Sequence, residues 1–484
     1  MAQAGFQQAV ETTLDIPLQG MPLLRGTGTN GQRFVNVLFE RIQNPLTGGS
    51  SLYTIKRPGL ANNTQPPAGA ATGRGIHYWE GSGKLYSVFN NKIYSDGTDL
   101  GVTLAGSTGK VWFTETAPTS STRLLIVSDG ADNYNIQTND TITQIDETDD
   151  VQYPTSNVGC IVFLNGYLFQ AQEDGEIWNT DPDAFTSWTG TAVEDADAYG
   201  DELVAIAKVR DQLVVFGKYS TEFYFDNGTT PTPLLRISQN SLAIGMAHKN
   251  TMGQAGDSIC WVSESPAIGE GGRAVWLMEG TNKVSKVSTP VIERFLNAET
   301  TTISTSSAWM ERIHGHLLYV INLDSTERTF VYDVDLQVWY EWSGTTITNK
   351  FPIIDVTSQN GVIYGIDAAN GRTSTFSNTT YQDNGTNFTV RLQTDNYDFG
   401  TPFNKFQSGL WIIGDNVAVT TVEVSEADDD YTTFNTARNM DFTNTRKFLS
   451  EGGAFVQRAY RIDFTSNNPF RVQKMVLKLD VGDA

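Results

Sequence analysis

Apolar and polar residues alternate in short runs along most of the chain, and turn-forming residues separate the runs. The segment Thr329–Trp342, TFVYDVDLQVWYEW, has two such runs around a turn that carries aspartate. Alternation with a period of two is typical of strands, because successive side chains point to opposite faces. The pattern therefore predicts a hairpin with Trp339 and Trp342 in its return strand.

Similar hairpin patterns recur along the chain, rich in β-branched and aromatic residues and bounded by Gly, Asn and Asp. They start roughly every 40 to 60 residues, which is about the length of one propeller blade. The spacing predicts a β-propeller of six or seven blades between about Ile55 and Phe376. The hairpins are Lys84–Ser95, Arg123–Ile136, Cys160–Trp178, Leu203–Phe225, Ile259–Met278, Leu317–Trp342 and Gly361–Phe376.

One segment, STPVIERFLNAET at Ser288–Thr300, departs from the strand pattern. Ser288 is a suitable N-cap, and Pro290 suits an early helical position. We expect a short helix between two blades that packs on the rim of the propeller. Its apolar face would consist of Val291, Ile292, Phe295 and Leu296.

The two ends of the chain carry a different strand pattern. After about Asn387 the alternating runs are longer, which predicts a β-sandwich. The first 40 or so residues also contain strand signal, and a closing strand from the distant terminus would remove an exposed sheet edge. We therefore expect an all-β chain with few short helices. Its regions would be an N-terminal segment, 1–54, that adds strands to propeller or sandwich, a propeller, 55–380, and a sandwich-like domain, 381–484.

The composition agrees with an all-β chain. Charged residues make up only 18% of the 484 residues, while aromatic residues reach 11%, a mixture that favours strands over long helices. The formal net charge is −22. An acidic balance of this size argues against a protein that grips nucleic acid through phosphate contacts, which require a basic surface.

The cysteines and the N-terminus bear on the cellular compartment. Cys160 and Cys260 lie in apolar strand contexts, so we expect buried free thiols in a reducing compartment, with a disulfide or a nucleophile as the alternatives. The first 20 residues lack the basic start and apolar core of a signal peptide. No apolar stretch approaches the roughly 20 residues of a membrane span. We expect synthesis in the cytosol without export by a standard signal.

Candidate chemistry is sparse. His314 and His316 flank Gly315 and could form a metal pair or lie in a loop, and no Asp, Glu or Cys cluster stands at supporting spacing. The acidic stretches Glu194–Glu202 and Glu426–Tyr431 could bind calcium or be solvated turns. The glycine-containing stretches Gly73–His77 and Glu270–Arg273 are expected to be loops rather than phosphate sites. We predict no catalytic, cofactor or metal residue and name no binding residue.

Three stretches resemble the tail hub, or nozzle, proteins of short-tailed bacteriophages, also called packaged-DNA stabilisation proteins. The first contains a strand with Asn36 and ends in a Pro-Gly turn, the second has an Asp-Pro dipeptide and a later FG…TEFY strand, and the third matches a Ser-Thr…Ile-Glu helix. Their order and spacing are compatible with that family. The stretches are Arg33–Leu60, Ile177–Phe225 and Lys286–Glu299.

The resemblance implies a structural protein of the virion tail, made in the host cytoplasm. Such hubs form a homo-oligomeric ring of six copies below the portal and its head-to-tail adaptor. They extend the DNA channel, help to retain packaged DNA, anchor tailspikes or fibres and carry the tip needle or plug. Double-stranded DNA would pass through the lumen without specific binding, and an acidic lumen wall would reduce its friction.

Two other classes of function stay open from the residues alone. A propeller glycosidase would place paired carboxylates across its central axis, but no such pair can be chosen among 55 acidic residues. A carbohydrate-binding or adhesion propeller would use some of the ten tryptophans and 18 tyrosines. Most of these aromatics fall at strand positions that alternate inward, which favours structural roles.

Overall fold

The computed structural model describes residues 11–43, 49–67, 69–116, 123–196, 198–264, 272–281, 283–418 and 420–482. In this part of the chain nearly all regular structure is strand, apart from the helix α1 (Pro290–Ala298) and the 3-10 turn η1 (Lys249–Thr251). None of its helices has the length and apolar character required to cross a membrane. The all-β prediction is confirmed.

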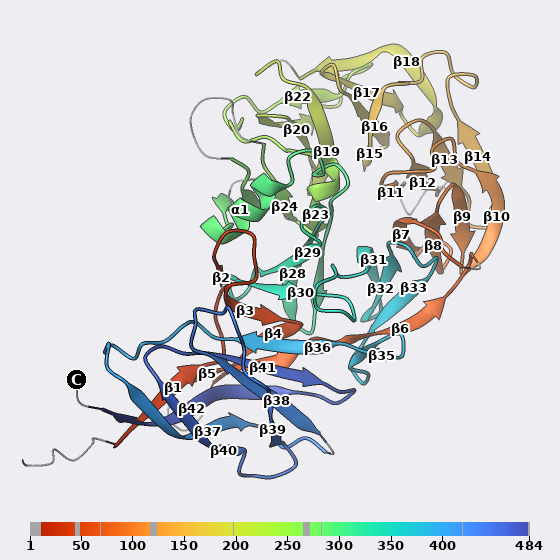
Figure 1. Ribbon diagram of the computed structural model, residues 1–484. Coiled ribbons are helices and arrows are strands. Elements are labelled where there is room, and N and C mark those ends of the chain that lie inside the picture. The colour runs from red at the N-terminus through yellow and green to blue at the C-terminus, as the bar shows by residue number, and fades with distance from the viewer. Residues whose placement is uncertain are drawn as a thin grey trace, which may run out of the picture.

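Four-stranded sheets follow one another around a ring, as Figure 1 shows. The first three sheets are consecutive antiparallel meanders. They consist of β7 (Gly73–Trp79), β8 (Lys84–Phe89), β9 (Lys92–Ser95) and β10 (Thr98–Thr103); β11 (Trp112–Glu115), β12 (Leu125–Ser128), β13 (Asn133–Ile136) and β14 (Ile142–Ile145); β15 (Asn157–Leu164), β16 (Tyr167–Gln172), β17 (Glu176–Asp181) and β18 (Ala184–Asp195).

The next three sheets repeat this arrangement, and α1 lies between the fifth and the sixth. They consist of β19 (Leu203–Val209), β20 (Gln212–Gly217), β21 (Thr221–Asp226) and β22 (Leu234–Arg236); β23 (Gly253–Ala255), β24 (Ser258–Val262), β25 (Val275–Glu279) and β26 (Lys283–Lys286); β27 (Ser307–Ile313), β28 (His316–Leu323), β29 (Arg328–Asp333) and β30 (Val338–Trp342).

The seventh sheet combines strands from distant parts of the chain. Strands β31 (Ile353–Gln359), β32 (Val362–Asp367) and β33 (Thr373–Ser377) are joined by β6 (Gly59–Thr64), which pairs antiparallel with β33. β31 lies beside β7, the first strand of the first sheet. A strand from the N-terminal side thus completes the last blade, and β34 (Gln382–Asp383) and β35 (Thr386–Asn387) extend that sheet.

Two further groups of strands form the sandwich at the lower left of Figure 1. One sheet has the order β4-β5-β42-β37-β40, with β1 also paired to β42, and the other has the order β3-β36-β41-β38-β39, with β2 paired to β3. Their inner faces share one apolar core. The strands are β1 (Glu11–Pro17), β2 (Leu23–Leu24), β3 (Gly31–Val35), β4 (Val37–Gln43), β5 (Ser50–Lys56), β36 (Thr389–Gln393), β37 (Lys405–Gly414), β38 (Thr421–Ala427), β39 (Arg438–Asp441), β40 (Phe448–Phe455), β41 (Ala459–Thr465) and β42 (Arg471–Val481).

One sheet runs through both parts of the molecule. β3 pairs in parallel with β30 of the sixth blade, with Val35 opposite Glu341, and antiparallel with β36 of the sandwich. The N-terminal strands therefore serve both parts, with β1 to β5 in sandwich sheets and β6 in the propeller. The boundaries predicted at residues 54 and 380 stay predictions.

The hairpin Thr329–Trp342 forms the two outer strands of the sixth blade, as predicted. Alternation did not produce one solvent-facing side, however, because Thr329 to Asp333 are all buried. The hairpin packs against α1 on one face and against the apolar core shared with the sandwich on the other, so the polar positions are enclosed too. Asp333 accepts a hydrogen bond from the Leu336 backbone at 2.9 Å, which stabilises the turn.

The helix is also present, with one correction to its start. Its apolar face is buried as expected, but the N-cap is Thr289, whose side chain accepts from the Ile292 backbone N–H. Ser288 lies one residue earlier, and its hydroxyl bonds Glu293 at 2.9 Å. Both residue types cap helices well, so local sequence could not distinguish them.

Candidate functional site

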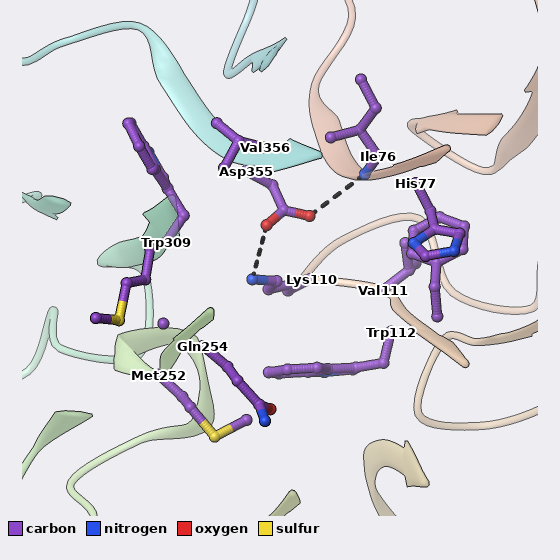
Figure 2. Close-up of a pocket in the computed structure, with 13 residues that line it drawn as sticks. Ile76, His77, Lys110, Val111, Trp112, Met252, Gln254, Trp309, Asp355 and Val356 are labelled. Carbon is purple, nitrogen blue, oxygen red and sulfur yellow. Dashed lines mark hydrogen bonds and ion pairs between the residues drawn. The ribbon is translucent and has the colours of Figure 1, made fainter. Parts of the chain in front are cut away.

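The centre of the propeller is the place where this fold would hold a ligand or catalytic groups. A cavity of about 170 Å3 lies there. Figure 2 shows its lining residues, which come from inner strands of several blades. Ile76 comes from β7, Trp112 from β11, Gln254 from β23 and Asp355 from β31. Strands from both halves of the propeller thus converge on this cavity.

An ion pair crosses this cavity. Lys110 Nζ lies 3.1 Å from Asp355 Oδ1 and 4.9 Å from the centre of the Trp112 ring, and the Ile76 backbone N–H donates to Asp355 Oδ2 at 3.3 Å. Asp355 is the one carboxylate among the described residues that line the cavity. Glycoside hydrolysis requires two carboxyl groups, so the described lining does not provide that arrangement.

A second cavity of about 420 Å3 adjoins the first and shares Trp112 and Gln254 with it. Burial lowers the pKa of Lys208 in its wall, and Arg210 pairs with Asp257 at 2.7 Å. Cys160 also lies here, but burial raises the pKa of its thiol to about 11. Because the thiolate is the reactive form, this cysteine is not an activated nucleophile.

Both cysteines are buried and free, as predicted, so the disulfide alternative is wrong. Burial also raises the pKa of the Cys260 thiol.

The four histidines have different surroundings. His77 contacts Glu115 at 2.9 Å, and burial lowers the pKa of His248 to about 4. The predicted alternative of a metal pair at His314 and His316 is not supported, since His314 contacts Asn378 whereas His316 Nδ1 lies 2.8 Å from Asp333. The described residues contain no group of three or more His, Cys, Asp or Glu suited to a metal.

The acidic stretch Glu426–Tyr431 is engaged by arginines. Glu426 pairs with Arg438 and Asp428 with Arg458, each at 2.6 Å, and Asp430 pairs with Arg25. These carboxylates are therefore neutralised individually rather than gathered around one cation.

The other stretches of interest have structural roles where they are described. In Glu194–Glu202, of which residue 197 lies outside the described part, Asp201 caps the turn at Ser220 with a 2.7 Å bond. Gly73–His77 was expected to be a loop, but it forms part of β7 because its backbone pairs with β8. Of Glu270–Arg273, residues 270 and 271 lie outside the described part, and Arg273 pairs with Glu264 at 3.1 Å.

A cluster of buried charges lies where the propeller meets the sandwich. The guanidinium of Arg57 is fully buried and forms two hydrogen bonds, of 3.0 and 2.6 Å, with Asp383, whose side chain is 5% exposed. Its central carbon lies 3.7 Å from the centre of the Phe388 ring. Further bonds go to Asn36 and to the Ser343 carbonyl, so this one cation joins β3–β6, the sixth blade and the start of the sandwich.

A second buried cluster lies at the shared sheet. Glu341 accepts from Arg33 at 3.0 and 2.8 Å and from Arg328 at 2.7 Å. Burial would raise the pKa of Glu341, but the two arginines outweigh it and hold the pKa below its usual value. Neither cluster was predicted, because Arg33 and Glu341 are 308 residues apart in the sequence and Arg57 and Asp383 are 326 residues apart. The one signal was the placement of arginine within apolar strand segments.

Comparisons with known proteins agree with this architecture. A model of the family described as "Bacteriophage P22 Gp10, beta-propeller" matches residues 19–381. The tail hub protein gp10 of Salmonella phage P22 is 24% identical over 335 residues, which cover 66% of this chain and 67% of that protein.

Two solved structures are similar to this chain at low sequence identity. A streptogramin B lyase is 12% identical with a TM-score of 0.40, covering 70% of this chain and 97% of its own. A virginiamycin B lyase from Staphylococcus aureus is 11% identical with a TM-score of 0.41, covering 70% and 100%. Neither likeness carries an argument about activity.

The family match covers most of the chain, including the propeller and the N-terminal strands β3 to β6. The three stretches that resemble hub proteins lie within it. The family and its tail hub relative place the chain among the structural proteins of phage tails. The chain belongs to the phage stabilisation family of Gp10-type β-propellers.

Proposed function

We propose that this chain is the hub, or nozzle, of a short phage tail. Copies of it would form a closed ring, of six in the simplest case, below the portal and its adaptor. The ring would extend the DNA channel, help to retain the packaged genome, anchor tailspikes or fibres and hold the tip plug or needle. The observation that carries the proposal is the family match over residues 19–381.

The junction between propeller and sandwich supports this role. A tail component must keep its shape while the genome is held under pressure and while it leaves. The shared sheet and the buried clusters of Arg57 and Glu341 connect the two parts through backbone pairing and charge-assisted hydrogen bonds. A flexible linker would leave the two parts free to move against each other.

The net charge of −22 supports passage of DNA rather than its capture. Phosphates are repelled by a surface of the same sign, and no counterions are released on contact. An acidic ring lumen is part of this proposal, and a ring reconstruction that places mainly Lys and Arg along the lumen would contradict it.

The enzyme alternative has less support, because Asp355 is already paired with Lys110 and stands without a second carboxylate among the described residues of its cavity. A carbohydrate-binding propeller would need an open aromatic face. Trp112 is the nearest candidate, but Lys110 lies over its ring at 4.9 Å.

The proposal is tested by electron microscopy of the purified chain, alone and after mixing with filled phage heads that lack tails. We expect rings with a central hole, or added density at the portal vertex. Hubs can stay monomeric until their platform exists, so the mixed sample is decisive. Particles that never join the heads would overturn the proposal, and glycan binding and cleavage would then be measured.

A further inference from the structure

The outer face of one sandwich sheet carries an apolar stripe. Strands β42, β37 and β40 lie side by side, and their registered pairs bring Val476 next to Trp411 and Trp411 next to Phe448. Along β37 the same face presents Phe406, which is 50% exposed, and Ile413, which is 43% exposed. We call these five residues, Phe406, Trp411, Ile413, Phe448 and Val476, the outer stripe.

The backbone under the outer stripe is adapted to it. The Trp411 and Phe448 rings pack in a tilted arrangement with 4.7 Å between centroids and lie over Gly409, where an added Cβ would come within 2.7 Å of Trp411. The inward side chains of the same strands already fill the sandwich core. The outer face of such a sheet is ordinarily polar, so exposed apolar side chains around a packed Trp–Phe pair there are typical of a protein interface.

The rim of the outer stripe carries cations. Arg446 lies over the Phe448 ring at 4.6 Å, and Lys474 and Lys478 flank Val476 on the same face. Lys474 pairs with Asp15 of the neighbouring strand. In a chain with a net charge of −22, an apolar surface with a partly basic rim fits a partner surface that is apolar at its centre and acidic around it.

This chain itself carries a surface of that kind on its propeller. Val151 is 84% exposed, the highest value among the exposed large apolar side chains of the described residues. It follows directly on the turn Asp146–Asp150, DETDD, after the outermost strand of the second blade, β14. We call Asp146–Val151 the acidic turn. In Figure 1 β14 lies at the side of the propeller away from the sandwich, so one molecule cannot join its own two surfaces.

We propose that the outer stripe docks on the acidic turn of the next copy of this chain. The two surfaces differ and lie at opposite ends of the molecule, so the contact is heterologous, the kind that builds a ring when the rotation between copies closes. This inference rests on the proposed ring, and it names the surfaces that would hold neighbouring subunits together. Val151 would insert among the aromatic side chains, and Arg446 would face the carboxylates of the turn.

The first test is chemical cross-linking between copies. Two variants, Ile413→Cys and Val151→Cys, are mixed at high concentration, alone and on tailless heads, with a short bismaleimide. The native Cys160 and Cys260 are buried and unreactive. We expect a cross-linked dimer only when both variants are present. A matched pair of Leu235→Cys, at a 48% exposed site on the propeller, with Val151→Cys should give none.

The second test separates this inference from the proposed function. Arg446→Glu and Asp149→Arg should each reduce the copies joined to heads at least tenfold, and the double variant should recover them. Rings on heads without the cross-link, or without rescue by the double variant, would overturn the inference and leave the hub. A cross-link without any joining to heads would support the docking contact and overturn the hub. Failure of both would overturn both.

Discussion

The junction and the propeller centre both contain charged residues between strands, but they use them differently. At the junction, Arg57 and Asp383 are almost completely enclosed and have several further hydrogen-bond partners. At the centre, Lys110 and Asp355 are each about one-seventh exposed, at 14% and 15%, and line a cavity. Burial makes removal of one partner costly, because the other charge cannot return to water. Of the two regions, the junction therefore depends more strongly on its charged partners.

The largest expected effect is at Arg57. Arg57→Ala leaves Asp383 buried without its cation and should lower the free energy of unfolding by about 3 to 5 kcal/mol. Urea denaturation followed by both tryptophan fluorescence and circular dichroism measures the change. The matched control is Arg210→Ala, which breaks an exposed pair at 2.7 Å and should leave the free energy of unfolding almost unchanged, because both charges stay in water. Equal losses would remove the distinction between the two regions.

A somewhat smaller loss, about 2 to 4 kcal/mol, is expected for Glu341→Gln, which removes the charge shared by Arg33 and Arg328 but keeps the shape of the side chain. Since these residues lie on both sides of the pairing between β3 and β30, the variant should also separate the unfolding of sandwich and propeller. Two transitions in calorimetry, where the wild type has one, would be the sign. An unchanged single transition at the original temperature contradicts the role assigned to this cluster.

At the propeller centre, Lys110→Met should cost about 1 kcal/mol, because Asp355 keeps some access to solvent and still accepts from Ile76. The change in the free energy of unfolding is measured by the same urea denaturation. A loss as large as that of Arg57→Ala would show that the centre is as rigid as the junction.

The smallest expected effects are opposite responses to pH. Burial, and then the charge of Arg57, lowers the pKa of Lys56 to about 7, so this residue should add stability as pH rises from about 7 toward its unfolded value near 10.4. The contact with Asp333 raises the pKa of His316, so its contribution is complete below about pH 6.5 and is lost as pH rises through the folded pKa. The difference in urea midpoint between the wild type and Lys56→Met should shift in favour of the wild type as pH rises from 7 to 9. The difference between the wild type and His316→Asn should shift against the wild type as pH rises from 6 to 8.

The sequence was informative wherever the controlling interaction is local. Alternation and turn residues located the hairpins, and the spacing of Val291, Ile292, Phe295 and Leu296 located the helix. Pairings between distant segments were not accessible, because a strand pattern does not identify its partner. β3 carried a strand signal, but nothing in it showed that it would connect β30 to β36.

The same limit applies to the candidate sites. The His314 and His316 alternative rested on proximity in sequence, yet a turn between β27 and β28 gives the two rings different partners. The buried arginine clusters and the outer stripe depend on which face of a strand is covered, and that is decided by tertiary packing. Phe406 and Ile413 have the same apolar character as core residues and were not distinguishable from them.

The pairing of β6 with β33 also imposes an order on biosynthesis. Thr64 and Thr373, whose hydroxyl oxygens lie 2.7 Å apart, are separated by 309 residues. After the first blades have been translated, β6 has no partner until the seventh blade is made. The edges of the early sheets stay unpaired during that time. Contacts of such long range form late and slowly. A chain interrupted before residue 373 cannot complete the circle, and its unpaired edges would mark it for chaperones or degradation before it could enter a virion.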